Sequence, residues 1–137
     1  MKYWLLKTEP EEWSWNQQVK SGNKGAEWNG VRNFQASKNL KKMKYLDKCF
    51  FYHTGKEKKI VGIVEVIKEH FLDKTDKTGK FVSVVVKALY PLKREVELQE
   101  IKKNKDFRDL PLVKQSRLSV MEIDLKSWKK ICKMGRV

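Results

Sequence analysis

The 137-residue sequence has few cysteines and histidines and no long apolar run, and each shortage excludes a class of protein. Cys49 and Cys132 are 83 positions apart, and neither His53 nor His70 has zinc-ligand spacing with them, so we expect no disulfide and no metal site. No run approaches the ~18 apolar residues of a membrane helix, and the apolar start at residues 1–7 is too short for a signal peptide. We therefore expect a cytoplasmic protein with no cofactor.

Acidic residues are also scarce, because 17 Asp and Glu oppose 31 Lys and Arg, which gives a formal net charge of +14. Such an excess favours a polyanionic partner, above all a nucleic acid. Only five of the basic residues are arginines. A second interpretation therefore stays open, in which the lysines form a solvated coat that reflects an AT-rich genome. The arginine positions are then more informative than the lysine positions.

Signatures of common enzyme classes are absent from the sequence. It contains no G-x-S-x-G nucleophile elbow, no P-loop and no glycine-rich dinucleotide fingerprint. Glu9, Glu11 and Glu12 lie close together around Pro10, but they resemble an acidic turn before a helix more than a Mg²⁺ site. These features favour a binding protein over an enzyme.

The expected fold class is α+β in a single domain over residues 1–137, because no linker or repeat divides the chain. Aromatic and β-branched runs predict strands over residues 2–7, 48–54, 60–71, 81–89 and 118–123. Apolar spacing and caps predict helices over residues 15–20, 34–43 and 98–103 and after Asp124. Residues 23–30 and 107–116 are expected to be loops.

Two positions predict local detail. Trp15 and Val19 are four residues apart and would share the buried face of the first helix. Gly62 lies inside a predicted strand, where it indicates a bulge or a close backbone contact.

Polar and aromatic residues gather at the ends of the predicted strands and at the start of a helix, where binding sites are commonly built. They form the patterns W-L-x-K-x-E-P, W-x-G-V-R-N-x-x-A, F-Y-H, G-I-V-x-V and R-L-S-V. In this order and spacing, the patterns are similar to the EVE domain over residues 1–131. The resemblance implies a PUA-like mixed β pseudo-barrel surrounded by short helices. It also implies a nucleic-acid-binding module whose pocket accepts a modified base, chiefly a modified cytosine in DNA.

A protein that reads one modified base takes it out of the stack, holds its ring and tests its edge with hydrogen bonds. Aromatic rings can hold the base, and amide, hydroxyl and backbone groups can test it. The candidate pocket residues are Trp4, Thr8, Trp28, Val31, Asn33, Tyr52, His53, Leu118, Ser119 and Val120. Alternatives stay open in which Trp4 is a core residue, Asn33 a helix cap and His53 a structural histidine.

Arg32 and Arg117 suit phosphate contact, because a guanidinium binds two oxygens at once. Lys7, Lys41 and Lys42 are further candidates for phosphate or ligand contact. The alternative for either arginine is a structural ion pair with a carboxylate. The expected protein is a non-catalytic reader of a modified base and a monomer. The alternatives are a general RNA-binding PUA-like protein in RNA processing or translation and a small ASCH-like enzyme.

Overall fold

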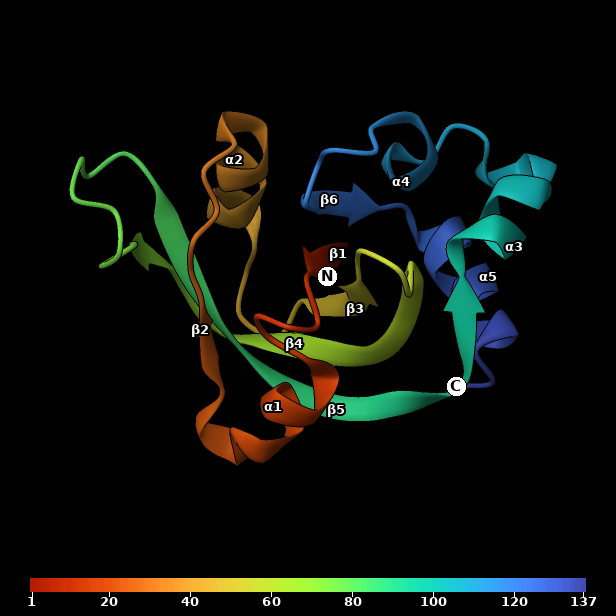
Figure 1. The fold of residues 1–137 in the computed structure, drawn as a ribbon, viewed down its shortest axis with the longest axis horizontal. Helices are drawn as coiled ribbons and strands as arrows, with labels where there is room; N and C mark the ends of the chain where they lie inside the picture. Colours follow the sequence, from red (N-terminus) through yellow and green to blue (C-terminus); the bar gives the residue numbers. More distant parts are fainter.

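Six strands form one mixed sheet in the computed structural model, which describes residues 1–137 (Figure 1). The strands are β1 (Tyr3–Thr8), β2 (Ala26–Trp28), β3 (Lys48–His53), β4 (Lys59–Leu72), β5 (Val82–Glu97) and β6 (Val120–Ile123). Their order across the sheet is β2-β5-β4-β3-β1-β6; β1 and β3 run parallel, and all other neighbours run antiparallel. The long strands β4 and β5 shift register repeatedly, and the sheet curls while β2 and β6 remain its two free edges.

Short helices surround the sheet, which confirms the α+β class. They are α1 (Trp15–Lys20), α2 (Phe34–Lys42), α3 (Leu98–Lys103), α4 (Pro111–Lys114) and α5 (Leu125–Met134), with 3₁₀ turns η1 (Gly22–Lys24) and η2 (Lys105–Phe107). Ser14, Asn33 and Asp124 cap α1, α2 and α5 through their side chains, as the sequence predicts. None of the helices has the length and apolar character that crossing a membrane requires.

Three segments differ from the prediction. The expected loop over residues 23–30 contains β2, whose three residues are too few for periodicity to reveal. The predicted strand over residues 81–89 continues to Glu97, because Leu92 and Val96 are buried. The strand includes Pro91, which is exposed and lies where the register between β4 and β5 shifts. The expected loop over residues 107–116 contains α4, which Pro111 begins.

The contact between α1 and the sheet confirms one local prediction and corrects another. A Cβ on Gly62 would lie 2.5 Å from the Trp15 ring, so glycine is needed for this close approach. Val19 is exposed, and Gln18 is buried in its place. The Gln18 amide donates to the Val86 carbonyl at 3.0 Å and accepts from Trp13 Nε1 at 2.9 Å, which satisfies a buried polar group that sequence periodicity would place outside.

Candidate functional site

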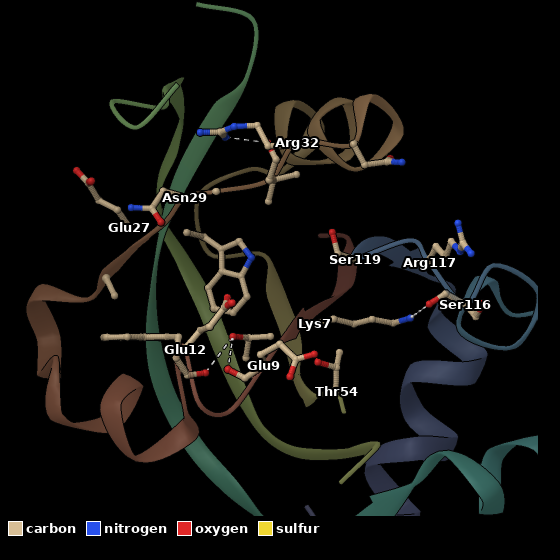
Figure 2. Close-up of a pocket in the computed structure, with 17 residues that line it drawn as sticks. Lys7, Glu9, Glu12, Glu27, Asn29, Arg32, Thr54, Ser116, Arg117 and Ser119 are labelled. Carbon is tan, nitrogen blue, oxygen red and sulfur yellow. Dashed lines mark hydrogen bonds between the residues drawn. The ribbon is translucent and has the colours of Figure 1, made fainter. Parts of the chain in front are cut away.

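A cavity of about 820 Å³ opens between the two free edges of the curled sheet (Figure 2). On one side it is lined by β2 and the segment that follows it, up to Asn33. On the other side it is lined by the end of β1, the turn after it, and the residues that precede β6. The curl of the sheet therefore brings together segments that are more than 80 positions apart in the sequence, such as 28–33 and 116–119.

Eight predicted site residues line this one cavity. They are Lys7, Thr8, Trp28, Val31, Arg32, Asn33, Arg117 and Ser119. All come from the segments 4–10, 28–36 and 116–120 that the sequence patterns single out. They lie at or next to the ends of β1 and β2 and the start of β6. The curl of the sheet brings these strand ends together around the cavity.

Arg32 is held in a fixed position by hydrogen bonds. Its Nη1 donates to Asp73 Oδ2 at 2.9 Å and to the Val31 carbonyl at 3.1 Å, and its Nη2 donates to Thr75 Oγ1 at 2.9 Å. The ion pair expected as an alternative for the arginines therefore exists, with Asp73 as the partner. The Arg32 side chain remains 40% exposed while that of Asp73 is fully buried, so Arg32 still presents part of its surface to the cavity.

Asp73 anchors the segment that forms one wall of the cavity. Its carboxylate accepts from the Gly30 N–H at 2.8 Å, from Arg32, and from both the N–H and the hydroxyl of Thr75 at 2.8 and 2.6 Å. Burial by itself would raise the pKa of Asp73, but the bonds from Thr75, Gly30 and Arg32 outweigh it and lower the pKa to about 2. The carboxylate is therefore ionised in the folded protein at neutral pH.

The cavity is balanced in charge although the chain is strongly basic. Its lining contains three acids and three bases, and their formal charges cancel. The acids are Glu9, Glu12 and Glu27, and the bases are Lys7, Arg32 and Arg117. Arg32 is paired with Asp73 and Glu27 with Lys74, and both partners lie outside the lining, so the cavity keeps no surplus of positive charge. An anionic group gains little by entering it, whereas a neutral polar group can bind.

Several polar groups in the lining have no hydrogen-bond partner in the protein. The Trp28 ring is 7% exposed and packs edge-to-face on Phe51 at 5.6 Å, yet its Nε1 is not shut off from solvent and has no acceptor. The hydroxyls of Ser119 and Thr54 likewise lack side-chain partners. Asn33 uses its Oδ1 to cap α2, at 2.9 Å from the Ala36 nitrogen, which leaves its amide nitrogen free. The cavity thus offers several donors and acceptors to a ligand.

Lys7 and Thr8 have partners within the protein. Lys7 Nζ donates to the Ser116 carbonyl at 3.0 Å and joins β1 to the segment before β6 on one side of the cavity, as Figure 2 shows. Burial lowers the pKa of the Lys7 ammonium. The Thr8 hydroxyl donates to the Trp13 carbonyl at 3.0 Å, so only its acceptor lone pairs remain for a ligand.

Comparison with known proteins assigns the chain to a family. The model of the EVE domain matches residues 2–134. The chain belongs to the EVE domain family. Thymocyte nuclear protein 1 of Gallus gallus is 33% identical to this EVE domain over 129 residues, which cover 85% of the chain and 53% of the relative. The chain thus spans about half the length of the curated relatives it matches.

Solved structures share the fold of this EVE domain. A Rhodopseudomonas palustris protein is 47% identical with a TM-score of 0.93, covering 98% of this chain and 93% of that one. Human THYN1, solved in complex with DNA that contains 5-methylcytosine, is 24% identical with a TM-score of 0.91, covering 100% and 99%. A Zygosaccharomyces rouxii YTH domain in complex with N6-methyladenosine RNA is 18% identical with a TM-score of 0.61, covering 99% and 85%. The predicted PUA-like fold is therefore confirmed.

Two aromatic candidates lie in the core of the EVE domain and do not line the cavity. Trp4 is fully buried, and its Nε1 donates to Asp47 Oδ2 at 3.0 Å, so it holds the turn before β3 to β1. Tyr52 is 3% exposed, and burial raises its pKa to about 12. Both lie on central strands that are buried on both faces, where alternation does not separate core from cavity.

His53 is a structural histidine in this EVE domain. Its Nε2 accepts from the Trp15 N–H at 3.1 Å, so its Nδ1 carries the proton and donates to Glu57 Oε1 at 2.9 Å. Both ring nitrogens are therefore occupied, Nε2 in joining α1 to the end of β3 and Nδ1 in holding Glu57 in the turn after β3. The side chain does not line the cavity.

The remaining candidates also lie outside the cavity lining. Leu118 and Val120 are buried, and the Val120 carbonyl accepts from Asn39 Nδ2 at 2.7 Å. Lys41 and Lys42 are exposed at the far end of α2, beside a separate depression that Met1 and Tyr45 also line. The two lysines can therefore contact a partner of the EVE domain only outside the cavity.

Sequence reasoning missed several residues of the lining. They are Glu9, Glu12, Trp13, Ala26, Glu27, Asn29, Gly30, Thr54 and Ser116. Four of them, Glu9, Asn29, Gly30 and Ser116, stand inside or next to the quoted patterns, and Thr54 directly follows F-Y-H. Their position beside patterned residues was thus the available signal. Nothing in the sequence separates Glu12, which lines the cavity, from Glu11, which does not.

Proposed function

We propose that this EVE domain is a non-catalytic module that binds nucleic acid and holds one modified base, a modified cytosine in DNA, in the cavity. The observation that carries the proposal is a charge-balanced cavity with unpartnered donors and acceptors in a chain of net charge +14. Its volume of about 820 Å³ lies in the range of small-molecule sites. A flipped base is a neutral, flat group whose edge needs such donors and acceptors.

Charge separates what enters the cavity from what stays outside. A phosphate group would meet the carboxylates of Glu9, Glu12 and Glu27, which repel it. The exposed basic residues outside the cavity attract the phosphates instead, and Arg117 at the edge forms no ion pair with the protein. The backbone of a nucleic acid is thereby held at the surface while one base enters.

The same carboxylates favour a base with an exocyclic amino group. In base recognition, Glu and Asp accept from the cytosine N4 amino group. Figure 2 shows the Glu9 side chain beside Thr54 in the cavity, and its Oε2 is 3.2 Å from the position that a Gly55 Cβ would take. The Trp28 N–H and the Ser119 hydroxyl supply donors for the ring acceptors. This arrangement supports a base that carries both an exocyclic amino group and ring acceptors, as cytosine does.

The relatives support a modified base in general. Human THYN1 is bound to DNA with 5-methylcytosine, and the YTH domain is bound to RNA with N6-methyladenosine. The two ligands differ in base and sugar but share a methylated base.

The proposal is tested with matched oligonucleotides. The protein is titrated with duplexes that contain one central cytosine, 5-methylcytosine or 5-hydroxymethylcytosine, at two salt concentrations. We expect tighter binding of one modified duplex. Equal, weak and salt-sensitive binding to all three would refute base recognition and leave only charge. Tighter binding of structured RNA regardless of modification would favour the general RNA-binding alternative.

Glu9→Gln and Glu11→Gln make a matched pair for the same assay. Both remove one negative charge from the same turn, but only Glu9 lines the cavity. Loss of a negative charge favours DNA binding in general, so we expect Glu11→Gln to bind all duplexes as well as or slightly better than the wild type. We expect Glu9→Gln to lose about tenfold or more in affinity for the modified duplex. Equal behaviour of the two variants would contradict a contact between Glu9 and the base.

A further inference from the structure

Phe34 exposes a large apolar ring beside the cavity. It is the first residue of α2, directly follows the cavity residue Asn33, and is 68% exposed. Its ring packs on Phe81 at 4.9 Å and 31°, and the Arg32 guanidinium lies 5.5 Å from the same Phe81 ring. Because Asp73 and Thr75 fix Arg32, the support beneath Phe34 is rigid. The aromatic ring is thus held in place while most of its surface faces solvent.

Lysines continue the exposed face of α2 that Phe34 begins. Lys38 and Lys42 follow Phe34 at intervals of four residues and lie on the same side of the helix. Both are exposed, and neither forms an ion pair with an acid of the protein. The opposite side of α2 packs on the core through Ala36 and Leu40. An aromatic ring followed by unpaired lysines matches the pattern of single-stranded nucleic-acid binding, with stacked bases and tracked phosphates.

We propose that Phe34 stacks on the nucleotide next to the base in the cavity and that Lys38 and Lys42 contact the phosphates that follow. The inference rests on the proposed function, because removing one base from the stack exposes the face of its neighbour. The ring of Phe34 covers that face at the mouth of the cavity. The unpaired lysines beside it favour a polyanion over a protein surface as its partner.

The test compares Phe34→Ala with Phe34→Tyr and with Leu125→Ala. Leu125 is a matched control because it is also the first residue of a helix, α5, is 51% exposed, and does not line the cavity. The probe is a duplex with one central 5-methylcytosine and 2-aminopurine as the adjacent base, whose fluorescence reports stacking. We expect Phe34→Ala to weaken binding about tenfold or more and to abolish the fluorescence change. Phe34→Tyr and Leu125→Ala should match the wild type.

The salt dependence separates stacking from charge. Phe34→Ala should leave the slope of log affinity against log salt unchanged, whereas Lys38→Ala should reduce it by about 0.9 for a duplex contact. The inference is overturned if Phe34→Ala binds the duplex like Leu125→Ala. It is also overturned if Phe34→Ala binds more weakly and its slope of log affinity against log salt is reduced. The proposed function fails separately, if the wild-type protein does not prefer the modified duplex at all.

Discussion

Replacing Asp73 by Asn should destabilise the protein and loosen the wall of the cavity at the same time. The fully buried carboxylate binds Gly30, Arg32 and Thr75, and thereby ties the segment after β2 to the turn after β4. The substitution keeps the size of the side chain but removes its charge. It also places an amide donor where the carboxylate accepts hydrogen bonds.

The magnitude follows from the pKa shift. The pKa of Asp73 falls from 3.8 to about 2 despite its burial, because the bonds from Thr75, Gly30 and Arg32 favour the charged form. A shift of this size corresponds to about 2 kcal/mol of unfolding free energy at neutral pH. Breaking a buried ion pair costs about 3–5 kcal/mol, but Arg32 is 40% exposed and can turn to water. We therefore expect a loss of about 2–3 kcal/mol.

The pH dependence of stability gives the deciding assay. Because the folded pKa lies below the unfolded value, the contribution of Asp73 is complete well above pH 3.8 and is lost as pH falls toward 2. By pH 3 the wild type should have lost about 1 kcal/mol of its advantage over Asp73→Asn. Urea unfolding of both proteins from pH 7 to pH 3 measures this.

Asp109→Asn is the control, since Asp109 pairs with Lys114 at the surface and its side chain is 77% exposed. Its substitution should change stability by less than about 1 kcal/mol. The reasoning is refuted if Asp73→Asn is as stable as Asp109→Asn at pH 7, or if the gap to the wild type does not narrow toward pH 3. Asp73→Asn should also bind the modified duplex several-fold more weakly, because Gly30 and Arg32 line the cavity.

Two further predictions concern the division between cavity and surface. Trp28→Ala should remove most of the preference for a modified over a plain duplex, about fivefold or more, as measured by competition binding. The double change Lys41→Ala and Lys42→Ala should weaken binding to both duplexes by the same factor and reduce the salt slope by up to about 1.8. If the lysine changes alter the preference instead, then the surface and the cavity do not act separately.

Polar residues at predicted strand ends allowed the sequence to predict part of the cavity lining. Lys7, Thr8 and Ser119 lie where a strand ends or begins, and all three line the cavity. Trp4 and Tyr52 lie inside central strands, and both faces of these strands are buried. The alternation of side chains along such a strand separates its two faces, but it does not tell which face packs in the core and which borders the cavity. Position along the strand does not decide it either, because Lys7 and its register partner Tyr52 are both the second-last residue of their strand, and only Lys7 lines the cavity.

The rest of the lining depends on the curl of the sheet. Thr54 follows β3, and Glu12 lies in the turn before α1, yet both line the same cavity as Trp28. Their meeting depends on the register shifts of β4 and β5, including the one at Gly62, where the Trp15 ring replaces a side chain. The sequence indicated a bulge or contact at Gly62, but it did not give the direction in which the sheet bends. From the sequence, Glu9 and Glu12 therefore resemble only an acidic turn before a helix.

Net charge alone would have led to a different view of the site. A chain of charge +14 predicts a basic cleft, but the cavity has equal numbers of acids and bases, and Arg32 already has a partner. At physiological salt, charges act over about 8 Å, so the exposed lysines can collect phosphates without attracting them into the cavity. A surplus of positive charge inside would bind any phosphate and would select no base. Under the proposed function, the balanced lining is therefore a condition for selectivity, and the lysines outside it would determine how often the protein encounters a nucleic acid.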